Sequence, residues 1–473
     1  MSGKTKKKRK KEEMLNPAVL ARYFSGICIF VTGVLLVRQN VILPAFIVFL
    51  SLMVLQIVSL YAESRNLLDL RILLSLSWLG GIALSVLGLT EWQRPWSLTM
   101  WLCAGGFYFL FNAAYDTVRL LYRRRKDDNV VVLDTGKQAY EKRMFLSIVI
   151  LTAVVLAAFL AEGVLEDFAF PLLVKETPEA YTSFHVPGLH YFAVSSVLVH
   201  PLSVICLFGT EQTKKKKVAV LFMNLAAMAV PVLLLSKFLV FSAIMYSVLA
   251  FLIVKKPPVK KTLLILGAAV LCAAAVFILV VGMRHYPEGY LQKTFRFRNQ
   301  ATPVFIQYPY LYVTINYENL NVQIGNLQHY SYGLRGALPF FALTGLKKFV
   351  PQIAELFNSL ERYNVFWQLP TETILYDAYS DFSVYGVAVF SLVLGAASAW
   401  ISRMTEKRGR VFGILMYVQF ANCLLLSFFS TWFSNATIWF YFIATFAIAL
   451  FCTGEEKGLF RLRPRDLTEE MKC

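Results

Sequence analysis

The stretch MFLSIVILTAVVLAAFLAE, residues 144–162, contains no charged side chain before its final glutamate and directly follows Lys142 and Arg143. An α-helix needs about 20 mostly apolar residues to cross a hydrocarbon layer of about 30 Å. Basic residues beside a span favour the cytoplasmic side of the membrane. The stretch therefore predicts a membrane-spanning helix that begins at the cytoplasmic surface.

Similar apolar runs recur along the whole chain. Of its 473 residues, 57% are apolar and only 16% are charged, whereas about a quarter of a soluble globular protein is charged. This composition excludes an ordinary cytosolic enzyme and predicts an all-α polytopic membrane protein. We predict about twelve transmembrane helices, near residues 18–37, 41–61, 69–90, 96–118, 144–162, 188–208, 218–235, 238–254, 262–282, 384–402, 411–430 and 433–452.

Most basic residues lie in alternate connections between the predicted spans. These connections and Arg22 hold 35 of the 47 Lys and Arg residues; they are residues 1–17, 62–71, 119–143, 209–217, 255–261, 403–410 and 453–473. Because basic connections stay in the cytoplasm, we predict that both terminal tails, 1–17 and 453–473, are cytoplasmic. The net charge of +18 is then an orientation signal and an attraction to anionic lipid headgroups. Nucleic acid is not expected as a partner.

The seven cysteines do not indicate a disulfide framework or a metal site. Five lie within predicted spans, Cys452 at the end of a span and Cys473 in the tail, and no pair has zinc-ligand spacing. We therefore predict that the chain has no metal and no redox role.

Two predicted external segments are long enough to do more than connect spans. The first, 163–187, starts with acidic residues and leads to His185 and His190, for which we expect structural roles. The second, 283–383, separates spans 1–9 (18–282) from spans 10–12 (384–452) and is the candidate functional region, because long ordered loops usually carry function.

The composition of the 283–383 loop suggests a ligand class. It holds 21 aromatic residues, including 11 of the 23 tyrosines. Tyrosine pairs a flat apolar face with a hydroxyl group, which suits sugar rings. A membrane-interface belt, where Tyr and Trp are also enriched, explains the composition equally well.

Basic residues in the same loop indicate phosphate binding. They are Arg284, Lys293, Arg296, Arg298, Arg335, Lys347, Lys348 and Arg362. Arginine binds phosphate oxygens through two parallel hydrogen bonds. In an extended chain, Arg296 and Arg298 would share one face. Ordinary contact with phospholipid headgroups is the alternative explanation.

Two further features lie near the predicted outer membrane surface. Lys237, between two short spans and close to Pro231 and Ser236, either reaches the surface or points a cation into a cavity. Residues 338–360 have the apolar spacing of an amphipathic helix, which we expect to lie in the outer leaflet and to be interrupted or delayed by Pro339 and Pro351.

Four segments carry a more specific pattern. They are FHVPGLHY at 184–191, LLSK at 234–237, PYLYVTINYENL at 309–320, and ET at 372–373 followed by DFSVYG at 381–386. Together with the organisation of nearly the whole chain, they resemble the bacterial oligosaccharide repeat-unit polymerases, the Wzy-type O-antigen and capsule polymerases. Family members often have Ser-Arg where this chain has Ser236-Lys237, and Asp-Phe-Gly where it has Asp381-Phe-Ser383.

This resemblance implies a glycosyltransferase of the GT-C type in the bacterial plasma (inner) membrane. Such an enzyme joins repeat units carried on undecaprenyl diphosphate at the outer face of the membrane, in O-antigen, capsule or exopolysaccharide biosynthesis. The implied partners are the lipid-linked oligosaccharide and the bilayer, with a chain-length regulator and a flippase as further partners. No cofactor is implied, in agreement with the lack of a carboxylate cluster for a divalent ion or of a glycine-rich phosphate loop.

The resemblance and the external position together suggest roles for individual residues. The lipid diphosphate is assigned to Lys237, Arg284, Arg296, Arg298 and Arg335. The sugar is assigned to Tyr310, Tyr312, Tyr317 and Tyr330. The catalytic candidates are His329, Glu318, Glu372 and Asp381, with Asp377 as another possible general base. A loop histidine in the related ligases favours His329.

Three other functions remain open. A ligase would move finished glycan to another acceptor. A transporter or flippase of lipid-linked sugars should show internal duplication and few long external loops, whereas this chain concentrates its length in one loop. A membrane scaffold would not need cations beside a tyrosine-rich loop.

Overall fold

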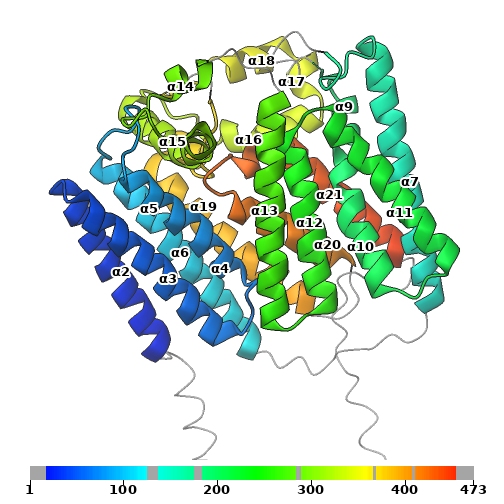
Figure 1. The fold of residues 1–473 in the computed structure, drawn as a ribbon, viewed down its shortest axis with the longest axis horizontal. Coiled ribbons are helices and arrows are strands. Elements are labelled where there is room, and N and C mark those ends of the chain that lie inside the picture. The colour runs from blue at the N-terminus through cyan, green and yellow to red at the C-terminus, as the bar shows by residue number, and fades with distance from the viewer. Residues whose placement is uncertain are drawn as a thin grey trace, which may run out of the picture.

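The computed structural model describes residues 17–124, 137–174, 184–283, 289–365, 369–406 and 411–453. These residues form an all-helical bundle without a strand (Figure 1). One isolated antiparallel bridge joins Thr90 to Phe297. Arg284, assigned above to the diphosphate, lies outside the described residues.

Eight helices in the described part are long and apolar enough to cross a membrane, which supports a polytopic membrane protein. They are α2 (Pro17–Arg38), α3 (Ile42–Ser64), α7 (Lys137–Leu165), the continuous α9, η2 and α10 (Leu189–Gly209), α11 (Lys214–Leu233), α12 (Lys237–Lys255), α13 (Val259–Met283) and α19 (Tyr376–Glu406). Each coincides with a predicted span.

The four remaining predicted spans also coincide with helices, but these are shorter or more polar. They are α4, η1 and α5 (Leu70–Leu74, Ser75–Leu79 and Gly80–Val86), α6 (Leu98–Arg124), α20 (Val411–Leu425) and α21 (Ala436–Thr453). The count of twelve transmembrane helices therefore stays a prediction.

The predicted long loop folds into a helical layer over one end of the bundle, which we call the cap (residues 289–365; Figure 1). It contains α14 (Tyr290–Phe295), α15 (Val304–Asn326), α16 (Leu334–Leu343), α17 (Leu346–Phe349) and α18 (Pro351–Asn358). The sequence does not predict α15, because its apolar and polar residues show little helical segregation and Pro309 lies inside it.

The amphipathic stretch at 338–360 is not one helix. Gly345 has φ 75°, which only glycine adopts easily, and it separates α16 from α17. Pro351 begins α18 and, because the residue before a proline is held extended, Val350 separates α17 from α18. The expected interruption at Pro351 is therefore present, whereas Pro339 lies inside α16.

Helix α15 is the part of the cap that packs against η1 and α5 of the bundle. The Tyr317 ring lies 5.1 Å from that of Trp78 and 5.6 Å from that of Trp96, and its hydroxyl donates to the Trp78 carbonyl. A Cβ atom at Gly81 would lie 2.3 Å from the Tyr317 hydroxyl. Only glycine at position 81 allows the cap to approach α5 this closely.

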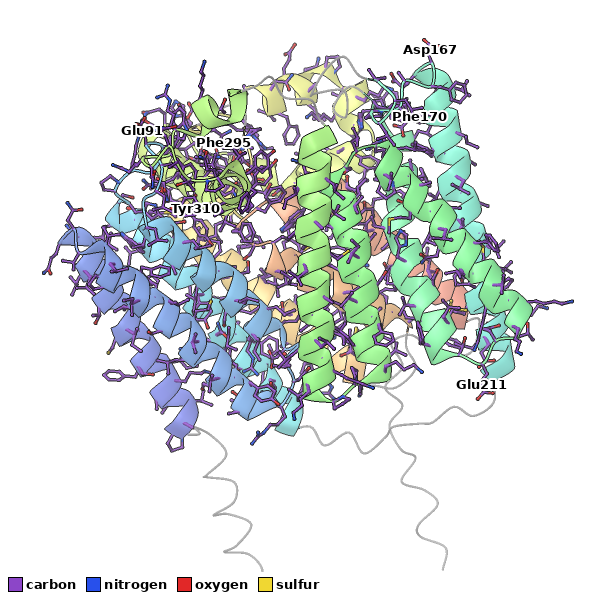
Figure 2. All side chains as sticks on the ribbon, viewed as in Figure 1. Glu91, Asp167, Phe170, Glu211, Phe295 and Tyr310 are labelled. Atoms are coloured by element: carbon purple, nitrogen blue, oxygen red, sulfur yellow. The ribbon has the colours of Figure 1, made fainter. Side chains whose placement is uncertain are left out.

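Labelled residues mark the two opposite ends of the bundle. Figure 2 shows Phe295, Tyr310 and Asp167 at the cap end and Glu211 at the opposite end. The amide of Glu211, which follows α10, donates to the carboxylate of Glu141 in α7 (3.0 Å). This arrangement agrees with the predicted alternation of connections, while the side of the membrane that each end faces stays a prediction.

A network of charged residues, buried except for the partly exposed Glu63 and Arg119, holds four helices together away from the cap. Arg71, fully buried, donates to Asp69 (2.7 Å) and to Asp116 (2.5 Å). Arg22 donates to Glu63 (2.7 Å) and to Asp116, and Arg119 donates to Glu63. The network balances three cations with three anions. Sequence analysis missed it because each charge lies near the end of its own span, where a charge normally faces the surface.

Candidate functional site

Two acids and two arginines meet where the cap joins α19. Arg335 of α16 donates to Asp377 in the first turn of α19 (3.2 Å) and to the Glu361 carbonyl. Arg362 donates to Glu372 (3.3 Å) and lies 4.0 Å from Asp377. The side chain of Arg362 is 48% exposed, whereas those of the other three are at most 5% exposed. We call these four residues the acid–arginine cluster; it opens outward at Arg362.

Glu372 has an unusual electrostatic environment. Burial, followed by the negative charge of Asp377, raises the pKa of Glu372 to about 8, although Arg362 and Arg335 oppose the shift. A carboxyl group with a pKa near neutrality can exchange a proton with a substrate, as general acids and bases must. Of the predicted catalytic residues, Glu372 therefore has the most suitable properties.

Unpaired polar atoms surround the cluster. Arg335 Nε, Thr371 Oγ1 and Thr373 Oγ1 are buried and have no hydrogen-bond partner among the described residues. Buried polar atoms nearly always have a partner in a protein or in ordered water. These atoms are therefore available to a bound ligand or to water beside Glu372.

A rigid hydrogen-bond network supports the cluster. Gln323 of α15 accepts from the Tyr376 hydroxyl (2.6 Å) and from the Tyr363 amide (2.9 Å), and donates to Ser380 (2.9 Å). Because these contacts join α15, the end of the cap and α19, they fix the segment that carries Arg362.

The Asp381 carboxylate accepts hydrogen bonds at the start of α16 and lies outside the acid–arginine cluster as defined above. It accepts from Ser331 Oγ (2.6 Å) and from the amides of Arg335 (3.1 Å) and Gly336 (2.9 Å). An anion at a helix N-terminus satisfies unpaired amides and the helix dipole. The catalytic candidate Asp381 thus holds the start of α16, and with it Arg335, in place.

The kink in α19 lies immediately after Asp381 in the sequence. Phe382 and Ser383 have non-helical angles, and Ser383 has φ 57° and ψ −147°. This conformation is nearly exclusive to glycine.

Lys237 is held in an aromatic cage. Its Nζ donates to the hydroxyls of Tyr308 (3.0 Å) and Tyr312 (3.3 Å) and lies 4.9 and 5.1 Å from their ring centroids. The Tyr312 ring also stacks on Phe429 at 5.7 Å. Lys237 therefore joins the start of α12 to α15 of the cap, and does not merely reach for the membrane surface.

The cage and the acid–arginine cluster lie against the same segment. Phe429 belongs to the turn after α20, in which the Ser427 carbonyl accepts from the amide of Ile374 (2.8 Å). Ile374 stands two residues after Glu372. This turn thus connects the cage to the segment that carries Glu372.

The other predicted cations bind the loop after α5. Arg296 and Arg298 are exposed on either side of the buried Phe297, although Arg296, with φ 44°, does not have the extended conformation that the one-face prediction assumed. The Arg296 guanidinium lies over Trp92 at 4.6 Å, and Arg298 Nε donates to the Gly88 carbonyl (2.9 Å). Both retain exposed surface for an anion.

The predicted sugar-binding tyrosines have different environments. Tyr317 is fully buried, and Tyr310 is buried with its hydroxyl bonded to Gln93 (2.9 Å), so neither offers a ring face to a sugar in this structure. Tyr312 is partly buried in the cage, and Tyr330 is 40% exposed.

His329 and Glu318 also differ. His329 is exposed on the segment beside the cluster, where the neighbouring Gln328 amide donates to Glu361 (3.0 Å). Glu318 is buried, and its carboxylate accepts from Trp96 Nε1 (2.7 Å) and the Arg94 amide (3.1 Å). Burial raises the pKa of Glu318 to about 7. Since both of its carboxylate oxygens accept from the α5–α6 connection, Glu318 fastens that connection to the cap.

Sequence reasoning did not single out the partner of Glu372. Arg362 is one of eight loop cations, and no local pattern marks it as the one that lies beside Glu372 in space, ten residues away in sequence.

Comparison of the chain with protein-family models, with curated proteins and with solved structures finds no match.

Proposed function

We propose that the protein is a glycosyltransferase that polymerises oligosaccharide repeat units carried on a lipid diphosphate, at the outer face of the bacterial plasma membrane. The observation that carries the proposal is the pairing of the buried Glu372, whose pKa is about 8, with the half-exposed Arg362. A base and a cation side by side suit a reaction in which a hydroxyl attacks and a diphosphate leaves.

The proposed chemistry assigns one task to each group. The acceptor sugar hydroxyl attacks the anomeric carbon of the donor while its proton passes to the Glu372 carboxylate. The bond between that carbon and the diphosphate oxygen breaks, and the lipid diphosphate departs with its charge. Arg362, the exposed member of the cluster, stabilises that charge, while Arg335 and Asp377 keep the site in position.

The location of the site supports a lipid-anchored substrate. The cluster lies at the junction of the cap with α19, one of the helices long and apolar enough to span a membrane. A diphosphate anchored in a bilayer by its lipid would be presented at this level of the bundle. The exposed Arg296 and Arg298 offer additional cations on the cap.

The direct test is complementation of a strain of the native host that lacks the gene. Wild-type protein should restore long surface glycan. The Glu372→Gln variant should leave single repeat units on the outer face, and Glu355→Gln, on the exposed face of α18, should behave as wild type. If Glu372→Gln, inserted at the wild-type level, makes polymer of normal length and amount, Glu372 is not the base.

A transporter of lipid-linked sugars is the second candidate, and one observation favours it. Ionisable residues inside a membrane protein often mark the path of a transported substrate. The ion pair between the buried Arg71 and Asp116 consists of such residues. In the deletion strain, single units trapped on the cytoplasmic face would support transport. Units that reach the outer face unpolymerised would support polymerisation.

A further inference from the structure

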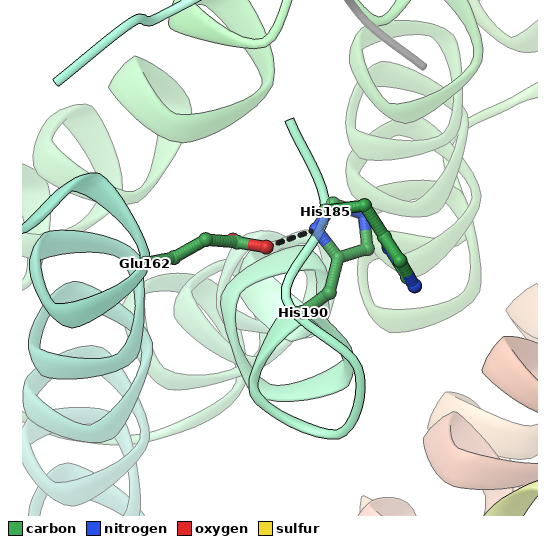
Figure 3. Close-up of side chains that lie close together, drawn as sticks. All are labelled: Glu162, His185 and His190. Carbon is green, nitrogen blue, oxygen red and sulfur yellow. Dashed lines mark hydrogen bonds and ion pairs between the residues drawn. The ribbon is translucent and has the colours of Figure 1, made fainter. Parts of the chain in front are cut away.

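Two histidines and a glutamate converge where the end of α7 meets the start of α9 (Figure 3). Glu162 lies in the last turn of α7, His185 precedes α9 (Leu189–Val194 of the longer helix), and His190 lies in the first turn of α9. Their potential ligand atoms all lie within 4.8 Å of one another.

Only one of the two carboxylate oxygens of Glu162 has hydrogen-bond partners among the described residues. Its Oε1 accepts from the Val186 amide (2.9 Å) and lies 2.9 Å from His190 Nδ1. Its Oε2 is buried and has no hydrogen-bond partner among the described residues, although the side chain of Glu162 is 0% exposed. A simple glutamate–histidine hydrogen bond explains Oε1. It does not explain a buried, unpaired carboxylate oxygen, which is costly.

The second histidine completes a set of donors. The His185 ring lies 4.7 Å from that of His190, at 63°. His185 is exposed, so its side chain can turn toward the carboxylate without disturbing the core. Two imidazoles and one carboxylate form a recurrent three-ligand zinc set that leaves a fourth position for water or another ligand.

The surroundings suit a bound ion. The Val186 amide orients the Glu162 carboxylate, as outer-shell hydrogen bonds do in metal sites. Phe159, Phe170 and Phe184 pack against one another beside it, with ring centroids 4.9 to 6.2 Å apart. An apolar shell strengthens the attraction between a cation and its ligands.

We propose that Glu162, His185 and His190 form a site for one divalent transition-metal ion, with Zn²⁺ as the expected ion. The bound ion fastens the end of α7 to the start of α9. The prediction of no metal from the sequence rested on the cysteines. It could not find this site, because Glu162 stands 23 residues before His185.

The test uses the full chain, purified in detergent, stripped of metal by a chelator and titrated with Zn²⁺ against a fluorescent zinc indicator. We expect one ion per chain for the wild type. The His185→Ala and Glu162→Gln variants should bind at least about tenfold more weakly. His329→Ala, which alters an exposed histidine of the cap, outside the proposed site, should bind as the wild type does.

Two further measurements make the outcome decisive. Co²⁺ should give the visible absorption of a four-coordinate site in the wild type and not in His185→Ala. Zn²⁺ should raise the thermal unfolding temperature of the wild type and not that of His185→Ala, which removes an exposed side chain and should fold normally. If wild type and His185→Ala bind Zn²⁺ equally, or if neither binds it, the proposal is overturned.

Discussion

The half-exposed guanidinium of Arg362 lies 3.3 Å from the buried carboxylate of Glu372. Burial and the charge of Asp377 raise the pKa of Glu372, while Arg362 and Arg335 lower it. The proton affinity of this buried carboxyl group thus depends on neighbours of both signs. This dependence gives the proposed catalytic role a pH signature that can be measured.

Polymerisation should increase with pH up to about 8 and then level off, because a general base acts in its deprotonated form. Removing Arg362 takes away a cation that favours the carboxylate, so the midpoint for Arg362→Ala should lie at higher pH. Removing the charge of Asp377 does the reverse, so the midpoint for Asp377→Asn should lie lower. The rate of chain elongation, measured with a lipid-linked repeat unit over a pH series, provides the check. Shifts in the same direction for both variants would contradict the assignment.

Glu372→Gln should lose activity and gain stability. The pKa of Glu372 is about 8 in the folded protein and near 4.5 for the free side chain. Between these values the folded state binds more protons than the unfolded state, so the contribution of Glu372 to stability is lost as pH rises through this window. Glutamine carries no charge at any pH. The unfolding temperature of the variant relative to wild type should therefore rise from pH 5 to pH 8, and a constant difference would refute the raised pKa.

The helices of the bundle follow from local sequence, whereas the contacts of the cap do not. Each predicted span is a predominantly apolar stretch, and a helix is found at every one of them. By contrast, Glu318 was predicted to be catalytic, and its partner Trp96 is 222 residues away. No local pattern predicts that the Trp96 side chain will donate a hydrogen bond to the Glu318 carboxylate.

The same limit explains the other site residues. Arg335 and Asp381 were assigned to different tasks, yet the Arg335 amide donates to the Asp381 carboxylate. Arg335 is a charged residue in an external loop, which predicts exposure, but its ion pair with Asp377 allows it to be buried. Residue type and external position could propose the candidates. Only the packing of α15, α16 and α19 sorts them into exposed and buried groups.

Ser383→Gly should stabilise the protein. Ser383 has φ 57° and ψ −147°, where glycine avoids a strain of about 1 to 3 kcal/mol. Part of that gain is offset by the greater freedom of glycine in the unfolded chain, about 0.5 to 1 kcal/mol. The matched control is Ser51→Gly, at an exposed position inside α3, which should destabilise by a similar small amount. Thermal unfolding of both variants in detergent should therefore shift in opposite directions.

Asp116→Asn should be strongly destabilising. Its carboxylate accepts from Arg71, which is fully buried, and from Arg22, so neutralising it leaves two buried cations with too little negative charge. Removing one partner of a buried ion pair typically costs about 3 to 5 kcal/mol. The exposed Glu355→Gln variant serves as the control. Lower insertion and an unfolding temperature well below that of the control are expected, and equal stability would show that the network is dispensable.

Lys237→Met should weaken the attachment of the cap to α12, because methionine fills a similar volume but cannot donate to Tyr308 and Tyr312. Each hydrogen bond contributes about 0.5 to 1.5 kcal/mol, and the position of the cation over the rings adds about 1 kcal/mol.

A second variant, Tyr312→Phe, removes only one hydroxyl group from the cage. If Lys237 acts through the cage, the double variant should lose less stability than the two single variants together, since both remove the same interaction. Lys237→Arg restores a cation and should recover most of the stability. Strictly additive losses would instead mean that Lys237 and Tyr312 act independently, and that the cage does not hold the cap on α12.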